Sequence, residues 1–268
     1  MKKDIDHALI QTEIIKVNGY QESQVEDSVV VEKALTVYLN GEEFVTMVYS
    51  PGLEKELAIG FLYSEGIISK PSDLLKISVD QGEGLVWAET KTSNGLGEKL
   101  FLKRYLTSCC GKGRSSFYFA NDARVASEIT SNLQISTEQV SKYSCMLEEN
   151  SELFHLTGGV HSGALASEGK FDYFAYDIGR HNVLDKLYGQ IFLAEEALSE
   201  KVLVFSGRIS SEILIKAAKM GCPIIIARSA PTDLALRLAD ELGITVIGFA
   251  REDRMNLYTH TMRVSRTF

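Results

Sequence analysis

The sequence has few residues of several informative kinds, and each shortage excludes a class of protein. The four cysteines, Cys109, Cys110, Cys145 and Cys222, are too few and too irregularly spaced for a disulfide framework in 268 residues, so we expect reduced thiols. No uninterrupted apolar run approaches the length that crosses a bilayer, which argues against a membrane protein. The first residues lack the apolar stretch of a signal peptide. We therefore expect a cytoplasmic protein.

Basic residues are fewer than acidic residues. Lysine and arginine total 28 against 36 aspartates and glutamates, a net charge of −8. Binding to a phosphate backbone requires a basic surface that releases counterions, so this balance argues against a general nucleic-acid binder. Any phosphate that the protein binds has to meet a local basic pocket. The content of 45% hydrophobic and 24% charged residues is ordinary for a globular protein. The length fits one large domain or two smaller ones, and we favour two.

The first part of the chain predicts an α+β domain, which we place at residues 1–125. A β-rich run at 34–39, the turn Asn40-Gly41 and a returning run at 43–49 predict a hairpin. Apolar residues recur at helical spacing from Leu53 to Leu62, which predicts a helix that ends by Gly66. Short strands are expected at 74–79, 84–90 and 99–103.

The rest of the chain predicts an α/β domain, which we place at residues 126–268. A polar segment leads into it, with an expected helix at 137–146. The domain contains three continuous apolar runs, typical of strands that are buried on both faces of a parallel sheet. Two helical patterns alternate with these runs, and a glycine suited to a left-handed C-cap ends each of them. This order predicts a βαβαβ unit with right-handed crossovers. The strands are expected at 202–205, 224–227 and 244–249, and the helices at 211–220, before Gly221, and at 233–242, before Gly243.

The adjacent cysteines lie in a glycine-rich and basic stretch. Gly111 and Lys112 follow Cys110, and Arg114 comes soon after. An electropositive and flexible setting lowers the pKa of a thiol and favours the nucleophilic thiolate, so Cys110 is a candidate for carrying sulfur. A glycine turn with two incidental thiols is the alternative interpretation. Cys222 is better explained as a small buried hydrophobic residue.

Two further groups of residues suit ligand binding. Gly158 and Gly159 precede His161, which would contact a ligand or a metal, although a hydrogen-bonded structural histidine is the commoner case. Asp177 is suited to cap a helix whose first turn presents Arg180, His181 and Asn182. Such a helix start favours an anionic ligand, and simple capping with a solvated face is the alternative.

Three loops follow the three predicted parallel strands, and each carries polar side chains. Because carboxyl ends of parallel strands share one edge of a sheet, we expect these loops to meet where open α/β sheets bind ligands. The first would form a phosphate cradle from amides, hydroxyls and one guanidinium. It is neither a Walker loop nor a dinucleotide-binding fingerprint. The loop residues are Ser206, Gly207, Arg208 and Ser210, then Ser229, then Phe249, Ala250, Arg251, Glu252, Asp253 and Arg254.

These stretches, in this order, resemble the FdhD/NarQ family of formate dehydrogenase accessory sulfurtransferases. The resemblance covers nearly the whole chain and is carried by residues 157–165, 177–189, 206–211 with 229–232, and 248–259, supported by 56–66. It implies a cytidine-deaminase-like core in the second domain and a homodimer. It also implies persulfide sulfur taken from a cysteine desulfurase and passed to a molybdenum bis(guanine dinucleotide) cofactor destined for formate dehydrogenase.

The resemblance assigns roles to particular residues. Cys110 aligns with the first cysteine of the family's Cys-Gly-x-Cys motif and is the expected persulfide carrier. Gly113 replaces the second cysteine and Cys109 is additional, so a two-cysteine relay is an open question. The implied cofactor site comprises Gly158, Gly159, His161, Asp177, Arg180, His181, Asn182, Ser206, Gly207, Arg208, Ser210, Ser229, Phe249, Ala250, Arg251, Glu252, Asp253 and Arg254, with GDP as a surrogate ligand.

Two other functions compete with this one. A zinc deaminase needs H-x-E and P-C-x-x-C, but Ser162 and Gly163 follow His161 and the chain has no C-x-x-C, so we expect no bound zinc. A non-catalytic chaperone that binds the molybdenum cofactor without handling sulfur is favoured by the loss of the second family cysteine.

Overall fold

The computed structural model of the protein describes residues 5–91, 105–106 and 128–266. The predicted strand at 99–103, the thiols of Cys109 and Cys110, and the boundary between residues 125 and 126 lie outside these residues, so those three predictions stay untested. None of the described helices is long and apolar enough to cross a membrane.

The larger sheet has six strands, in the order β10-β9-β11-β12-β13-β14. The three central strands β11, β12 and β13 are parallel, which confirms the predicted βαβαβ order, and the outer ones run antiparallel to their neighbours. The strand bounds are β9 (His161–Ser167), β10 (Lys170–Asp177), β11 (Val202–Phe205), β12 (Ile224–Ala227), β13 (Thr245–Arg251) and β14 (Arg254–Thr259).

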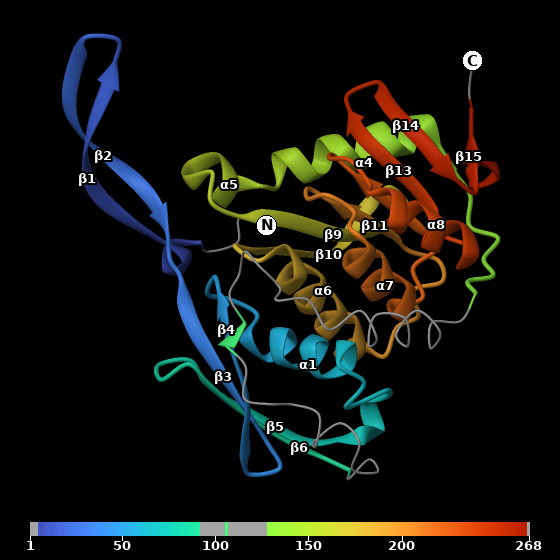
Figure 1. Cartoon of the computed structure of the whole chain (residues 1–268), viewed down its shortest axis with the longest axis horizontal. Coiled ribbons are helices and arrows are strands. Elements are labelled where there is room, and N and C mark those ends of the chain that lie inside the picture. Colours follow the sequence, from blue (N-terminus) through green and yellow to red (C-terminus); the bar gives the residue numbers. More distant parts are fainter. Residues whose placement is uncertain (1–4, 92–104, 107–127, 267–268) are drawn as a thin grey trace.

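Helices cover both faces of this sheet (Figure 1). On one face, α6 (Arg180–Ala194), α7 (Ser211–Met220) and α8 (Asp233–Glu241) share a buried apolar cluster with the strands. On the other face lie α4 (Thr137–Glu149) and the short α5 (Glu152–Thr157). The result is a three-layer α/β domain, because the parallel strands bury apolar side chains on both of their faces.

The smaller sheet belongs to the first part of the chain and has the order β5-β6-β3-β4-β7. Its hairpin turns at Asn40 and Gly41, both at positive φ, as the sequence predicts. The helix α1 (Glu54–Ser64) packs on this sheet and ends close to the predicted position. The strand bounds are β3 (Lys33–Leu39), β4 (Glu42–Tyr49), β5 (Leu74–Asp80), β6 (Leu85–Thr90) and β7 (Tyr105–Leu106).

The two halves are joined by a close crossing of α1 and α6. A Cβ atom built on Gly60 would lie 1.9 Å from the carbonyl oxygen of Asp185, and one on Gly189 would lie 2.0 Å from that of Glu56. Real Cβ contacts are never this short, so the two backbones approach this closely only because glycine occupies both positions.

A long two-stranded ribbon extends away from the body of the molecule (Figure 1). It consists of β1 (Leu9–Asn18) and β2 (Gln21–Val30), which the sequence analysis did not predict. The remaining elements are short. They are the 3₁₀ turns Asp6–Ala8, Pro71–Asp73 and Thr261–Arg263, and the paired strands β8 (Ile135–Ser136) and β15 (Val264–Ser265).

Candidate functional site

The three predicted loops meet at the carboxyl edge of β11, β12 and β13. The amide of Ile209 donates to the carbonyl of Ala230 (3.1 Å), and the amide of Thr232 donates to the carbonyl of Ile209 (3.0 Å). The amide of Phe249 in turn donates to the carbonyl of Ser229 (3.2 Å). The loops therefore form one hydrogen-bonded surface, as the parallel order predicts.

His161 stands at the same edge, because β9 runs antiparallel to β11 and begins where β11 ends. Ser162 and Ser206 fasten the two strands here, since the amide of Ser162 donates to Ser206 Oγ (2.9 Å) and the amide of Ser206 donates back to the Ser162 carbonyl (3.0 Å). A Cβ on Gly207 would lie 3.5 Å from His161 Nδ1 and only 2.8 Å from the ring of Phe205. Glycine at 207 thus lets the loop lie against the histidine.

Burial and positive charge set the ionisation of His161. Burial lowers the pKa of His161, and Arg180, His181 and Arg208 lower it further, against the opposing effect of Asp177. A neutral imidazole is therefore favoured, able to donate or accept a hydrogen bond. Within the described ranges, no three His, Cys, Asp or Glu side chains are grouped to hold a metal ion. The expected absence of zinc stays a prediction.

Asp177 has a different place from the one predicted. The N-cap of α6 is Gly179, and Asp177 is fully buried two residues before it. Asp177 Oδ1 accepts from the Gly179 amide (2.8 Å) and from Asn182 Nδ2 (2.9 Å), and Asn182 Nδ2 also donates to the Val48 carbonyl (2.9 Å). The predicted capping was wrong, and both side chains are engaged by protein groups. We therefore assign both side chains to the positioning of α6, and ligand contact by the half-buried Asn182 stays a prediction.

A buried lysine completes this network. Lys186 Nζ lies 2.7 Å from Asp177 Oδ2 and donates to the carbonyls of Ser50 (2.8 Å) and Tyr176 (3.1 Å). The amide of Ser50 donates to Asp177 Oδ2 (3.2 Å). Burial raises the pKa of Asp177, and Lys186 opposes that rise. The pair ties the end of β4 to the end of β10, and so fixes the first turn of α6 to both halves of the protein.

That first turn presents Arg180 and His181 to the candidate site. His181 Nε2 is buried and lies 3.0 Å from Glu212 Oε2, although the two atoms are not aligned for a hydrogen bond. Contact with His181 lowers the pKa of Glu212, against the effect of burial. Ser210 caps α7 through its hydroxyl, which accepts from the Ile213 amide. The edge thus combines cationic side chains with the positive end of a helix dipole, a setting that attracts anions.

The hairpin between β13 and β14 forms the far side of the site. Phe249 is 45% exposed and has φ 53°, and Glu252 has φ 49°, conformations that are uncommon for residues other than glycine. Ala250 is buried and its carbonyl accepts from Ser144 Oγ (2.6 Å), so its side chain does not reach a ligand. The four residues that follow it, Arg251, Glu252, Asp253 and Arg254, are exposed.

Arg228 was missed by the sequence analysis. It follows β12 directly, its guanidinium forms an ion pair with Glu148, and burial and the nearby Arg251 lower its pKa. Its position one residue before Ser229, at the end of a parallel strand, was the available signal. The predicted Gly158 and Gly159 lie on the loop that leads to His161, where Gly158 ends α5 at φ 64° and a Cβ on Gly159 would meet Val30 of the ribbon.

The strand β7 (Tyr105–Leu106) is the last described element before the two adjacent cysteines. β7 pairs with β4 in parallel, with Tyr105 opposite Thr46 and Leu106 opposite Met47. The end of β7 therefore lies on the same side of the sheet as the end of β4, which leads to Ser50 and the buried pair. Of the described cysteines, Cys145 is exposed and Cys222 is buried, as predicted for Cys222.

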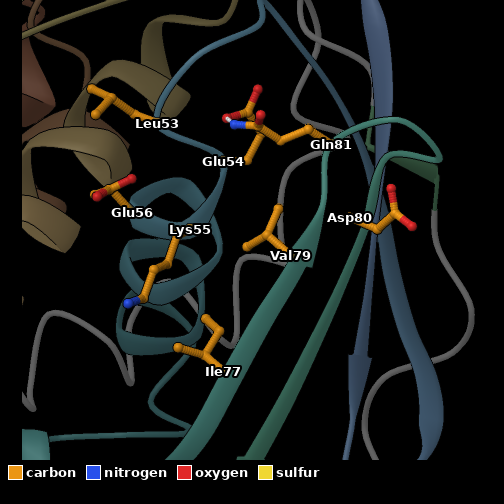
Figure 2. A pocket seen from close by; sticks show the side chains of 8 residues that line it. All are labelled: Leu53, Glu54, Lys55, Glu56, Ile77, Val79, Asp80 and Gln81. Atoms are coloured by element: carbon orange, nitrogen blue, oxygen red, sulfur yellow. Dashed lines mark hydrogen bonds between the residues drawn. The ribbon is translucent and has the colours of Figure 1, made fainter.

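A hollow of about 560 Å³ lies apart from this site, between α1 and β5 (Figure 2). Glu54 accepts from Gln81 Nε2 there (3.1 Å), and the wall holds three carboxylates and one lysine. This acidic balance does not suit a phosphate. The lining residues are Leu53, Glu54, Lys55, Glu56, Ile77, Val79, Asp80 and Gln81.

Comparison with known proteins places the chain in a family. The family model described as the FdhD/NarQ family matches residues 30–265, and the chain belongs to this family. A protein named sulfur carrier protein FdhD from Listeria innocua is 45% identical over 243 residues, 90% of this chain and 93% of that protein. One of the same name from Bacillus subtilis is 46% identical over 242 residues, 90% of this chain and 92% of that protein. The family resemblance noted in the sequence is thus confirmed.

A solved structure supports the fold. The crystal structure of a protein described as a formate dehydrogenase accessory protein from Desulfotalea psychrophila matches with a TM-score of 0.80. The match covers 96% of this chain and all of that one, at 22% sequence identity. The mixed α/β architecture is therefore shared, while the cytidine-deaminase-like classification of the core stays a prediction.

Proposed function

We propose that this protein is a sulfur carrier for formate dehydrogenase. It would accept persulfide sulfur from a cysteine desulfurase and transfer it to the molybdenum bis(guanine dinucleotide) cofactor. The observation that carries the proposal is the identity of 45% and 46%, over 90% of the chain, to proteins named sulfur carrier protein FdhD. The cytoplasmic location and the homodimer implied by the resemblance belong to the same proposal.

The sulfur step would use the thiolate of Cys110. It attacks the terminal sulfur of the desulfurase persulfide, the S–S bond of that persulfide breaks, and the desulfurase thiolate leaves. Cys110 then carries the terminal sulfur. Release of that sulfur as sulfide requires two electrons, which a second thiol supplies by attacking the Cys110 sulfur and forming a disulfide with it.

The basic sheet edge supports binding of the phosphorylated cofactor. In a protein of net charge −8, Arg180 and Arg208 act on His161, and Arg251 and Arg254 lie on the hairpin that follows the third parallel strand. Guanidinium groups form strong charge-assisted hydrogen bonds with phosphates, and the N-terminus of α7 adds partial positive charge. GDP would serve as a surrogate for the nucleotide ends of the cofactor.

Chain length limits how far Cys110 can lie from β7. Four peptide links separate Leu106 from Cys110, and four links span at most about 14 Å. β7, which ends at Leu106, lies beside β4, whose following residue Ser50 is bonded to Asp177 and Lys186. Leu106, the last described residue before the proposed carrier thiol, thus lies on the strand next to β4, which leads to the network that positions α6.

Mass spectrometry after incubation with a cysteine desulfurase and cysteine tests the proposal. We expect one added sulfur atom on Cys110, and we expect Cys110→Ala to abolish both the adduct and formate dehydrogenase maturation while the fold is retained. Cys145→Ala is the matched control, because Cys145 is the exposed thiol of the described residues. An adduct that maps to Cys145 or Cys222, or maturation supported by Cys110→Ala, contradicts the proposal.

A cofactor chaperone that does not handle sulfur is the second candidate. It is favoured by Gly113, which stands where the family has its second cysteine. This function predicts GDP binding and maturation of formate dehydrogenase by the Cys110→Ala variant, with no persulfide on the wild-type protein. The same experiment therefore separates the two candidates.

A further inference from the structure

The ribbon of β1 and β2 exposes several large apolar side chains. Its two strands of ten residues pair only with each other in the described structure. Ile15 is 68% exposed, Val17 is 59% exposed and Tyr20 at the tip is completely exposed. A two-stranded ribbon is marginally stable in water, and exposed apolar patches commonly mark interaction sites. The ribbon therefore has the character of a surface that a partner covers.

The two faces of the ribbon differ in charge. Directly paired residues of an antiparallel ladder point to the same face, so the register assigns every side chain to one face or the other. One face carries Glu13, Glu22 and Glu26 beside Ile15 and Val17, and it has no lysine or arginine. We call it the acidic face, and its residues beyond the root are Gln11, Glu13, Ile15, Val17, Glu22, Gln24, Glu26 and Ser28. The opposite face has one lysine and one aspartate, and so no net charge.

The acidic face contains an unfavourable pair. Glu13 lies directly opposite Glu26, and like charges in that position destabilise a sheet. Gln24 Nε2 donates to Glu13 Oε2 (3.2 Å), and the carboxylates of Glu13 and Glu26 are both exposed. A cationic group placed between the two would convert their repulsion into attraction. The face is therefore complementary to positive charge.

The negative charge of the acidic face determines which kinds of partner can bind it. Nucleic acids and anionic membranes carry negative charge, so the acidic face repels them. A second ribbon laid on the same face would bring six glutamates together, which disfavours self-pairing through it. A protein surface that offers both cationic and apolar side chains satisfies the glutamates and covers Ile15 and Val17.

The root of the ribbon lies next to the candidate site. Leu9 and Val30 pack in a cluster with Val160 and Ile178, and Val160 directly precedes His161. A Cβ on Gly159 would lie 2.7 Å from Val30 Cγ1, so the ribbon sits closely against the loop that leads to His161. A partner held along the ribbon is thus held beside the sheet edge where the ligand is expected.

We propose that the acidic face of the β1–β2 ribbon is a docking surface for a partner protein that presents basic and apolar side chains together. Interleaved glutamates and aliphatic residues give the surface its specificity. The inference stands on the ribbon alone and does not depend on sulfur transfer.

The test uses a defined probe, a capped twelve-residue peptide of alternating lysine and valine, titrated into the full-length protein. We expect binding that the triple variant Glu13→Gln, Glu22→Gln, Glu26→Gln weakens at least tenfold. The matched control removes three exposed glutamates, Glu42→Gln and Glu43→Gln in β4 and Glu83→Gln in the turn between β5 and β6, and should change the affinity less than twofold. A peptide of alternating lysine and serine should bind at least tenfold more weakly than the lysine and valine peptide.

Three results would overturn the proposal. They are absence of binding to the wild-type protein, equal loss of binding in the triple variant and in its control, and equal affinity for the two peptides. Analytical ultracentrifugation tests whether the protein self-associates through the acidic face. A wild-type dimer that becomes monomeric in the triple variant, or in Ile15→Ser with Val17→Ser, would show that a second copy of this chain occupies the face instead. None of these measurements involves sulfur or cofactor, so the proposed function is tested separately.

Discussion

Replacing Lys186 by methionine tests whether the buried pair holds the two halves together. Lys186 is 1% exposed and Asp177 is fully buried, so Lys186→Met leaves a buried carboxylate without its cation. Breaking one partner of a buried pair costs about 3 to 5 kcal/mol. Two hydrogen bonds from Lys186 Nζ to main-chain carbonyls are lost in addition. We expect the free energy of unfolding to fall by an amount in that range.

The dependence on pH has a definite sign. Burial raises the pKa of Asp177 and Lys186 opposes the rise, so removal of the lysine raises this pKa further. A carboxyl group whose pKa in the folded state lies above its unfolded value contributes stability that is lost as the pH rises through the folded pKa. The deficit of Lys186→Met relative to the wild-type protein should therefore grow from pH 5 to pH 8.

Urea unfolding of Lys186→Met, Asp177→Asn and the double variant measures the coupling. Removing both charges leaves no uncompensated ion, so we expect the double variant to recover at least half of the loss caused by Lys186→Met. A loss below about 1 kcal/mol in Lys186→Met, or strict additivity of the two single changes, would refute the reasoning. In that case the pair would not be what fastens β4 to α6.

A glycine substitution, two arginine substitutions and thiol alkylation test other parts of the structure. Gly189→Ala should destabilise the protein by about 1 to 3 kcal/mol in urea unfolding, because its Cβ would lie 2.0 Å from a main-chain oxygen of α1. Arg208→Ala and Arg254→Ala should each weaken GDP binding by about tenfold to a hundredfold in calorimetry, and unchanged affinity in both would show that the pocket is misplaced. Alkylation at pH 8 without denaturant should modify Cys145 and spare Cys222, since burial raises the pKa of Cys222 to about 12.

The βαβαβ unit was predictable because its signals are local. Short apolar runs such as Val202–Phe205 and Ile224–Ala227 lie between glycine-ended helical patterns, and this alternation is specific to parallel sheets. The gathering of three loops at one edge then follows from topology alone. The site residues in those loops were therefore reached without knowledge of any contact between them.

Other features were out of reach because their signals are weak or non-local. The ribbon buries neither face, so it lacks the alternation by which a half-buried strand is recognised, and Asn18 with Gly19 was its only clear turn signal. Asp177 looked like a helix cap because it directly precedes a helical pattern. Its burial could not be predicted, because it depends on contacts with Ser50 and Lys186. The hydrogen bond from the Ser50 amide spans 127 residues, a separation that no local pattern encodes.

The helix α6 contacts both halves of the protein. Its first turn faces the sheet edge through Arg180 and His181, and its middle crosses α1 at the backbone contact of Gly189. Lys186, between them, holds the carbonyl of Ser50 at the end of β4, the strand beside which β7 runs toward the cysteine segment. A displacement of α6 would therefore move the expected ligand site relative to β7. The buried charges thus hold β4, and with it β7, in one fixed arrangement with the expected ligand site.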